Sequence, residues 1–196
     1  MRVLITAGPT YEPIDPVRFI GNRSSGQMGA ALATAALDAG HEVTLILGPI
    51  TAAMPNVIGK TRRIDIFSSS DLLAAVLKEF PAHDLLIMAA AVADFRPKAV
   101  QTQKTERGGS LTIELESTED IAAAAGKIKR PEQRSVGFSL VERGPAGLER
   151  SRKKLARKNL DLIVFNPLDT MSSSTIESIL LYPDGRSEEL PVRPKA

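Results

Sequence analysis

The sequence of 196 residues lacks cysteine and tryptophan, and it contains only two histidines. Without cysteine the chain has no disulfide and no thiol nucleophile. Without an H-x-x-x-H pair or a G-x-S-x-G elbow it offers neither a zinc site nor a serine hydrolase motif. No stretch approaches the roughly 20 apolar residues that a membrane helix needs, and the N-terminus has no signal-peptide pattern. These absences predict a cytoplasmic protein that does not enter a membrane.

An excess of either charge is also missing, because 25 Lys and Arg residues face 23 Asp and Glu residues. A net charge of +2 gives no general reason to expect nucleic-acid binding. The charge is nevertheless uneven, with eleven basic and three acidic residues from Lys127 to Lys158. Arg150, Lys154 and Lys158 are spaced by four, so a helix would bring them to one face. Such a face is usually only solvated, but three aligned cations repel one another and favour a bound anion.

Apolar runs of strand length alternate with segments of helical character along the chain. The runs cover residues 2–8, 41–48, 84–92, 135–140 and 160–166, and the helical segments cover 26–40, 71–80, 118–128 and 146–159. This alternation predicts an α/β fold with a parallel sheet. The length fits one domain that spans residues 1–196.

The remaining segments are shorter or more polar. Residues 111–116 alternate like a strand with one solvated face, and a Pro-Asp-Gly turn at 183–185 predicts a C-terminal hairpin. Ser70 or Asp71 is the expected N-cap of the second helix. Residues 48–60 and 166–175 have the composition of linkers.

Ligands of open parallel sheets bind beyond the carboxyl ends of the strands. The segments that follow or end the predicted strands are TAGPTYEP (6–13), AAAVADFRP (89–97), GFSLVE (137–142) and VFNPLD (164–169). We therefore expect a site assembled from these four segments.

Ser24, Ser25 and Gly26 stand at the predicted start of the first helix. A helix N-terminus presents free N–H groups to a phosphate, although Ser24 or Ser25 as a simple cap is the plainer interpretation. Neither G-x-x-x-x-G-K-[ST] nor G-x-G-x-x-G is present, and no acidic residue ends the second strand. An ordinary NAD site is therefore disfavoured.

Other polar residues border the same strand ends. Glu12 and Asp15 lie beside two prolines, where acidic residues usually form turns and stay solvated, although a metal or a proton is a possible partner. Asn22 can both donate to and accept from a polar substrate. Asp94 follows a run of alanines, and its carboxylate can accept hydrogen bonds from a ribose or a base or lie near Mg²⁺. A helix cap or a turn is the alternative role for this residue. Lys104 lies in a glycine-bearing loop that could close over a triphosphate.

Four segments together carry a resemblance to a known family. ITAGPTYEPIDPVRFIGNRSSGQMG, AAAVADFRP, a loop lysine before LTIELE, and RKNLDLIVFN resemble the phosphopantothenoylcysteine synthetases, the ligase half of the bifunctional coenzyme A biosynthesis flavoproteins. The resemblance implies a Rossmann-like three-layer fold with a mostly parallel sheet and an antiparallel C-terminal hairpin. It also implies a homodimer that joins 4'-phosphopantothenate to cysteine through an acyl-nucleotide, using CTP or ATP with Mg²⁺. A separate flavin-dependent decarboxylase would act next.

The resemblance also assigns roles to residues. Asn22 and Lys104 match the residues that handle the acyl-nucleotide intermediate and form the anhydride. The matches to nucleotide-binding positions are Ser24, Ser25, Gly26, Ala89, Ala90, Asp94, Phe138, Lys154 and Lys158. No protein metal ligand is assigned.

The chain departs from the family pattern in several places. The lysine loop reads KTER where the family has K-x-K-K, so Glu106 and Arg107 replace two lysines. Val141 and Pro167 stand where acidic residues are usual, and the segment before the last hairpin is shortened. These differences leave open a catalytically weakened nucleotide-binding paralogue, and an NAD(P)-dependent oxidoreductase remains the more distant alternative. The sequence does not choose between CTP and ATP.

Overall fold

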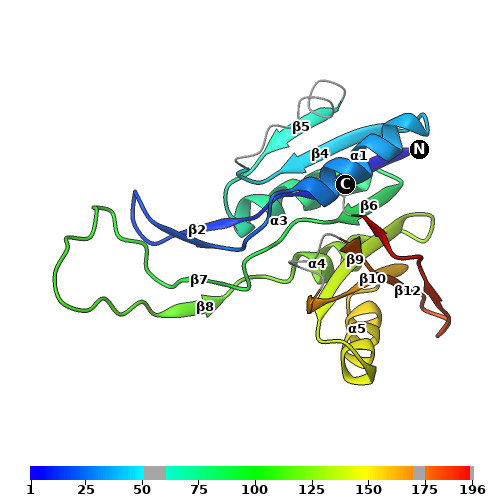
Figure 1. Ribbon diagram of the computed structural model, residues 1–196. Helices are drawn as coiled ribbons and strands as arrows, with labels where there is room; N and C mark the ends of the chain where they lie inside the picture. Colours follow the sequence, from blue (N-terminus) through cyan, green and yellow to red (C-terminus); the bar gives the residue numbers. More distant parts are fainter. Residues whose placement is uncertain (51–60, 170–174, 195–196) are drawn as a thin grey trace.

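A twisted eight-stranded sheet forms the centre of the computed structural model, which describes residues 1–50, 61–169 and 175–194 (Figure 1). Its strands lie in the order β13-β12-β10-β9-β6-β1-β4-β5. Their bounds are β1 (Arg2–Ala7), β4 (Glu42–Leu47), β5 (Arg62–Asp65), β6 (Leu85–Met88), β9 (Arg134–Val141), β10 (Leu162–Pro167), β12 (Ile179–Leu181) and β13 (Ser187–Glu189).

Six strands of this sheet, β1, β4, β5, β6, β9 and β10, are parallel to one another. The last two, β12 and β13, extend the sheet in antiparallel fashion. Numbered by their order in the chain, the parallel strands run 3-2-1-4-5-6 across the sheet, which is the Rossmann order. The order in which successive strands are added to the sheet reverses between β1 and β6. The expected Rossmann-like fold with a C-terminal antiparallel hairpin is confirmed.

Helices cover both faces of the sheet, which gives three layers (Figure 1). They are α1 (Gln27–Asp38), α3 (Ser69–Glu79), α4 (Ile121–Ile128), α5 (Pro145–Arg157) and the 3₁₀ turn η1 (Phe80–Ala82). None of these helices in the described ranges is long and apolar enough to cross a membrane.

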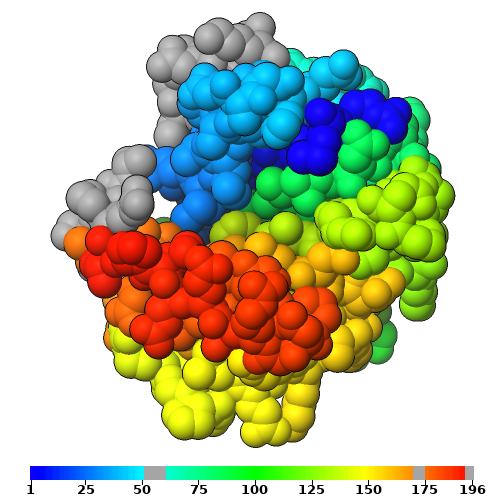
Figure 2. All heavy atoms as spheres, turned by 90° about the vertical axis from the view of Figure 1, so that its right-hand side faces the viewer, coloured from blue at the N-terminus to red at the C-terminus, as the bar shows by residue number. Residues whose placement is uncertain are grey.

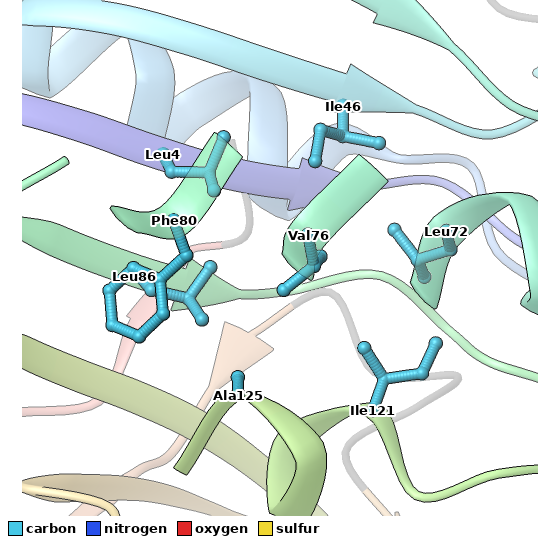
Figure 3. Packing of buried hydrophobic residues seen from close by; sticks show 8 residues of the cluster. All are labelled: Leu4, Ile46, Leu72, Val76, Phe80, Leu86, Ile121 and Ala125. Carbon is cyan, nitrogen blue, oxygen red and sulfur yellow. The ribbon is translucent and has the colours of Figure 1, made fainter. Parts of the chain in front are cut away.

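Two cores meet across β1, whose side chains alternate between the two faces. Val3, Ile5 and Ala7 pack with α1 and β4, and Leu4 packs on the opposite face with α3, η1 and α4. Figure 3 shows this second core, in which Phe80 and Leu86 lie beside Leu4. Because β1 is buried on both sides, its sequence reads as one continuous apolar run.

A third core lies under α5, at the other end of the sheet. Leu155 on α5 packs with Ile163 and Phe165 of β10 and with Leu181 of β12. Figure 2 shows the C-terminal segment, in orange and red, lying between α5 in yellow and the N-terminal half in blue. The hairpin therefore covers the sheet edge that the parallel strands leave.

Two small hairpins leave the body on one side (Figure 1). β2 (Tyr11–Pro13) pairs with β3 (Phe19–Gly21), and β7 (Phe95–Pro97) pairs with β8 (Leu115–Ser117). The long connection between β1 and α1 thus contains a hairpin of its own. Residues 98–114 form an extended loop beyond β7 and β8, which we call the arm loop.

Several local expectations were wrong. Ser68, rather than Ser70 or Asp71, caps α3: its side chain accepts from Asp71 N at 3.2 Å, and Asp71 accepts in return from Ser68 N at 2.9 Å. This reciprocal capping box starts the helix at Ser69, two residues before the expected segment 71–80. Only Leu115 and Glu116 of the strand expected at 111–116 belong to a strand, β8, which ends at Ser117. The polar strand β5 was not expected.

The linkers expected at 48–60 and 166–175 lie partly outside the described residues. In their described parts, Gly48 donates to Ala7 O at 2.9 Å, and residues 166–167 belong to β10. A linker composition therefore does not prevent ordered pairing at the ends of these segments.

We predict that Gly29→Ala destabilises the fold, because a Cβ at Gly29 would lie 2.3 Å from the Cβ of Ala7. Alanine would favour an isolated helix by about 1 kcal/mol. The clash between α1 and β1 costs more, and we expect a net loss of about 1–2 kcal/mol in the free energy of unfolding.

Gly108→Ala is the matched control, because nothing lies within 4 Å of a Cβ at that position. Urea unfolding followed by circular dichroism measures both variants. Equal midpoints for Gly29→Ala and the wild type would show that α1 can shift away from β1 without cost.

Candidate active site

A cavity of about 490 Å³ opens between α4 and α5, over the face of β6, β9 and β10. Its walls come from the end of β6 and the chain beyond it, from the start of α4, and from the last turn of α5. The lining residues include Ala90, Asp94, Asp120, Phe138, Lys154 and Lys158. The cavity therefore gathers residues from two of the four predicted segments, 89–97 and 137–142, and none from 6–13 or 164–169.

Lys154 and Lys158 lie on one face of α5 and both line the cavity, as their spacing predicts. Lys158 Nζ lies 3.0 Å from Asp120 Oδ1 and Arg157 Nη2 lies 3.2 Å from Asp120 Oδ2. Burial alone would raise the pKa of Asp120, but the hydrogen bonds from Lys158 and from Ala123 N outweigh it and lower this pKa. Asp120 is thus an ionised counter-ion inside the cavity.

Lys154 is less well compensated than Lys158. In the described part of the chain no carboxylate lies within 4.0 Å of its Nζ atom. Burial lowers the pKa of Lys154 first and repulsion by Lys158 lowers it further, while the carboxylate of Asp94 acts in the opposite direction. An anion placed between Lys154 and Lys158 would relieve this repulsion.

The alanine segment after β6 runs beside the end of β1. Ala89 N donates to Thr6 O at 3.1 Å and Ala90 N donates to Thr6 Oγ1 at 3.2 Å. Ala90 lines the cavity and Ala89 does not, and Asp94 lies exposed at the cavity's edge. The small side chains leave this rim open to a flat ligand.

Asn22 is joined to the same segment, since its Nδ2 donates to Val92 O at 2.7 Å. This bond connects the approach to α1 with the rim of the cavity. The Asn22 side chain is exposed, and its amide oxygen is the group that would meet a substrate.

Ser24, Ser25 and Gly26 precede α1 and lie outside the lining of the cavity. Gly26 is the N-cap residue, with φ 76°, and no side chain caps the helix. Ser24 Oγ and Ser25 Oγ accept only long bonds, of 3.4 and 3.5 Å, from Gly26 N and Gln27 N. The simple-cap alternative is therefore wrong, and the phosphate-binding role stays a prediction.

Phe138 lines the cavity from the middle of β9. A Cβ at Gly137 would point toward Leu160 and Ile163 under α5, so strand alternation directs the ring of Phe138 to the opposite face. The main chain of Phe138 is then the part that meets the cavity.

Lys104 lies away from the cavity, on the exposed arm loop that extends from the body in Figure 1. Within one chain the structure therefore does not bring Lys104 to Lys154 and Lys158. The base of the arm does reach the cavity, because Phe95 and Ser117 line it.

Glu12 and Asp15 were expected to be solvated turn residues. The expectation that they are solvated is wrong, because both residues are 2% exposed. Glu12 Oε1 accepts from Ser69 N at 2.8 Å, at the start of α3. Asp15 does form the turn, but its carboxylate is enclosed by donors from the arm loop and from Arg18. Neither belongs to a cluster of three or more His, Asp or Glu side chains suited to a metal within the described residues.

The segments 137–142 and 164–169 contribute less than expected. Beyond residues 137–138, none of their residues lines the cavity. Glu142 Oε2 instead pairs with Arg150 Nη1 at 3.1 Å, and Asn166 Oδ1 accepts from Ser178 Oγ at 2.6 Å. Arg150, which was predicted to share a helix face with Lys154 and Lys158, is thereby neutralised by Glu142 outside the cavity.

Asp120 and the residues around it, 117–122, were missed as site residues. The sequence pattern identified a capped helix there, and Asp120 does cap it, accepting from Ala123 N at 3.1 Å. A residue that caps a helix at the end of a parallel strand also faces the ligand edge of the sheet. The position of Asp120 at the predicted start of this helix was therefore the sequence feature that could have identified it as a site residue.

The fold and this cavity define the chain as a Rossmann-like α/β protein with a cationic pocket beyond the strand β6. It belongs to the family described as the DNA/pantothenate metabolism flavoprotein C-terminal domain, whose model matches residues 1–196.

Curated relatives agree with this family. The chain is 43% identical over 198 residues to the coenzyme A biosynthesis bifunctional protein CoaBC of Bacillus subtilis (strain 168), covering 98% of this chain and 48% of the relative. It is 49% identical over 168 residues to a protein named cysteine/cysteine sulfinic acid decarboxylase from an unknown prokaryotic organism, covering 85% of this chain and 46% of the relative. The chain thus spans about half the length of these relatives.

A solved structure matches closely as well. The crystal structure of the C-terminal domain of the coenzyme A biosynthesis bifunctional protein CoaBC superposes with a TM-score of 0.82 at 39% identity. The match covers 99% of this chain and 87% of that one.

We predict that Lys154→Gln weakens binding of inorganic tripolyphosphate about tenfold or more. A hydrogen bond from a charged group contributes about 1.5–3 kcal/mol, and tenfold in affinity corresponds to about 1.4 kcal/mol. Isothermal titration calorimetry at fixed ionic strength measures the change.

Lys153→Gln is the control, because the adjacent Lys153 is exposed and pairs with Glu149 at 2.7 Å. A similar loss of affinity in both variants would mean that tripolyphosphate responds to the general charge of α5 and not to the cavity.

Proposed function

We propose that this chain is an amide-forming ligase that joins 4'-phosphopantothenate to cysteine in coenzyme A biosynthesis, with CTP or ATP as the co-substrate. The observation that carries the proposal is the junction of Asn22 with the rim of the cationic cavity, in a chain of this family. An activated acyl group at Asn22 would then lie beside a nucleotide in the cavity.

The chemistry proceeds in two steps. The carboxylate of 4'-phosphopantothenate attacks the α-phosphorus of the nucleotide, the bond to the β-phosphate oxygen breaks, and pyrophosphate leaves. The amine of cysteine then attacks the acyl carbon, loses a proton and displaces the nucleoside monophosphate. Lys154 and Lys158 are positioned to bind phosphate oxygens. Their positive charges would stabilise the negative charge that develops on the departing pyrophosphate.

The nucleotide contacts follow from the same placement. The open rim at Ala89 and Ala90 accommodates the sugar or base, and Asp94 is the candidate acceptor for their hydrogen bonds. Mg²⁺ bound by phosphate oxygens needs few protein ligands, and the carboxylate of Asp94 at the cavity's edge suits it. This ion would neutralise phosphate charge.

Lys104 requires a further element, because it lies on the arm loop away from the cavity. We propose a homodimer in which the arm loop of one subunit supplies Lys104 to the other. Exposed apolar side chains near the arm support an interface there: Phe95, Val100, Leu111 and Leu115 are 53%, 51%, 56% and 43% exposed. Single exposed apolar residues are common, but four on one extended segment are not.

Three broader proposals complete the assignment. Residues 1–196 act as one domain, because the family model spans them all. The protein works in the cytoplasm, consistent with the absence of cysteine. A flavin-dependent decarboxylase, carried by a separate region or protein, would use the product, since coenzyme A biosynthesis proteins named bifunctional are about twice the length of this chain.

A weakened paralogue is the second candidate, and the KTER loop is the observation that favours it. Glu106 in that loop offsets Arg107, so the loop attracts a triphosphate less strongly than three lysines would. Such a protein would bind the nucleotide and turn over slowly.

The test is turnover by the purified chain with 4'-phosphopantothenate, cysteine, Mg²⁺ and either CTP or ATP. We expect pyrophosphate release that depends on phosphopantothenate, and one nucleotide preferred over the other. Product formation is measured by mass spectrometry. Nucleotide binding with little or no pyrophosphate release would instead favour the weakened paralogue.

We predict that Lys104→Gln slows pyrophosphate release at least tenfold, because a cation at the leaving group contributes several kcal/mol of transition-state stabilisation. The midpoint of thermal unfolding should not change, since Lys104 is exposed.

Lys98→Gln is the control on the same arm, where Lys98 Nζ pairs with Glu114 at 2.8 Å. Unaltered pyrophosphate release by Lys104→Gln would remove Lys104 from the mechanism.

A further inference from the structure

The arm loop is attached to the tip of the β2–β3 hairpin by bonds on both sides of Lys104. Gln101 N donates to Ile14 O at 2.9 Å, three residues before Lys104. Thr105 N donates to Asp15 Oδ2 at 3.1 Å, immediately after it. An exposed lysine is thus held between two fixed points of its own backbone.

Thr105 is held at its carbonyl as well. Arg18 Nη2 donates to Thr105 O at 3.1 Å, while Arg18 Nη1 donates to Asp15 Oδ2 at 2.9 Å. Asp15 and Arg18 therefore bind both main-chain polar groups of Thr105, the N–H and the C=O. We call this set of bonds the Thr105 clamp.

The two oxygens of Asp15 have different partners. Oδ1 accepts from Val17 N at 2.8 Å and from Arg18 N at 2.9 Å, which closes the hairpin turn. Oδ2 accepts the bonds of the Thr105 clamp, from Arg18 Nη1 and Thr105 N. One oxygen shapes the turn, and the other fixes the arm loop.

The carboxylate is ionised throughout the working pH range. Burial alone would raise the pKa of Asp15, but the N–H groups of Val17, Thr105 and Arg18 outweigh it and lower this pKa to about 2. The side chain of Asp15 is 0% exposed. A buried charge with four donors is rigid, because any movement would leave it unpaired.

We propose that Asp15, through the Thr105 clamp, is a positioning residue that fixes the backbone from which Lys104 reaches the nucleotide. This inference rests on the proposed function, in which Lys104 acts on the departing pyrophosphate. A flexible loop would hold that cation in the productive position for only part of the time. Misplacement by about 1 Å is enough to cost on the order of 100-fold in rate.

Asp15→Asn tests this, because asparagine keeps one oxygen for the turn and replaces the other by an NH₂ group. That group faces the Thr105 N–H and the Arg18 guanidinium, all of which are donors, so the clamp opens while the turn remains. We expect pyrophosphate release to slow about 10- to 100-fold. In a Lys104→Gln background, Asp15→Asn should slow pyrophosphate release by less than a further twofold, because both substitutions act through the ammonium group of Lys104.

Limited trypsin cleavage after Lys104 measures the clamp without any reaction. We expect cleavage of the Lys104–Thr105 bond to accelerate at least fivefold in Asp15→Asn, and cleavage after Lys98 to change less. Asp184→Asn is the matched control, because Asp184 Oδ1 also accepts from a backbone N–H two residues ahead, Arg186 N, at 3.0 Å, in a turn outside the arm. If Asp15→Asn does not fold, Arg18→Met opens the clamp from the other side.

The outcomes separate the two ideas. Unchanged cleavage after Lys104, or an equal slowing of pyrophosphate release with and without Lys104, overturns the positioning role. If the wild type releases no pyrophosphate with either nucleotide, the proposed function fails, and the cleavage rates alone then show whether the clamp holds the arm loop.

Discussion

The site depends on one main-chain interaction, the alignment of residues 89–93 along residues 6–10 beyond the ends of β6 and β1. Ala91 N donates to Gly8 O at 2.8 Å and Thr10 N donates to Ala91 O at 3.2 Å, so the main-chain ladder continues past both strands. Asn22 then joins this ladder at Val92, and Thr118 Oγ1 joins it at Ala93 O, at 2.6 Å. The approach to α1, the rim of the cavity and the start of α4 are all fixed to these few residues.

The parallel sheet could be predicted from sequence because its strands are buried on both faces and read as apolar runs. β5 was missed for the opposite reason: its Arg62 is paired with Glu79 of α3, a contact that a local pattern does not contain. The capping box at Ser68 was missed because its serine stands outside the apolar periodicity. Local signals identify elements well where burial alone decides them, and poorly where a distant partner does.

The same distinction holds in the site. Lys154 and Lys158 share a face because helical spacing dictates it, and Asp94 reaches the ligand edge because it follows a parallel strand. Asp15 was assigned to a solvated turn, since its first oxygen behaves as a turn aspartate. Its second oxygen binds Thr105, which is 90 residues away in sequence. No spacing rule connects them, so the clamp becomes visible only in three dimensions.

Geometry also changes the meaning of the KTER loop. Glu106 and Arg107 largely cancel in charge, so in the proposed ligase the long-range attraction of a triphosphate would fall to the cavity, where Lys154 lacks a carboxylate partner among the described residues. In the same proposal Lys104 would be a single cation acting over a short range, and short-range electrostatics depend steeply on distance and on the exclusion of water. A loop with three cations tolerates motion, because one cation can replace another. A loop with one effective cation does not, which is the physical reason to hold its backbone at both Gln101 and Thr105.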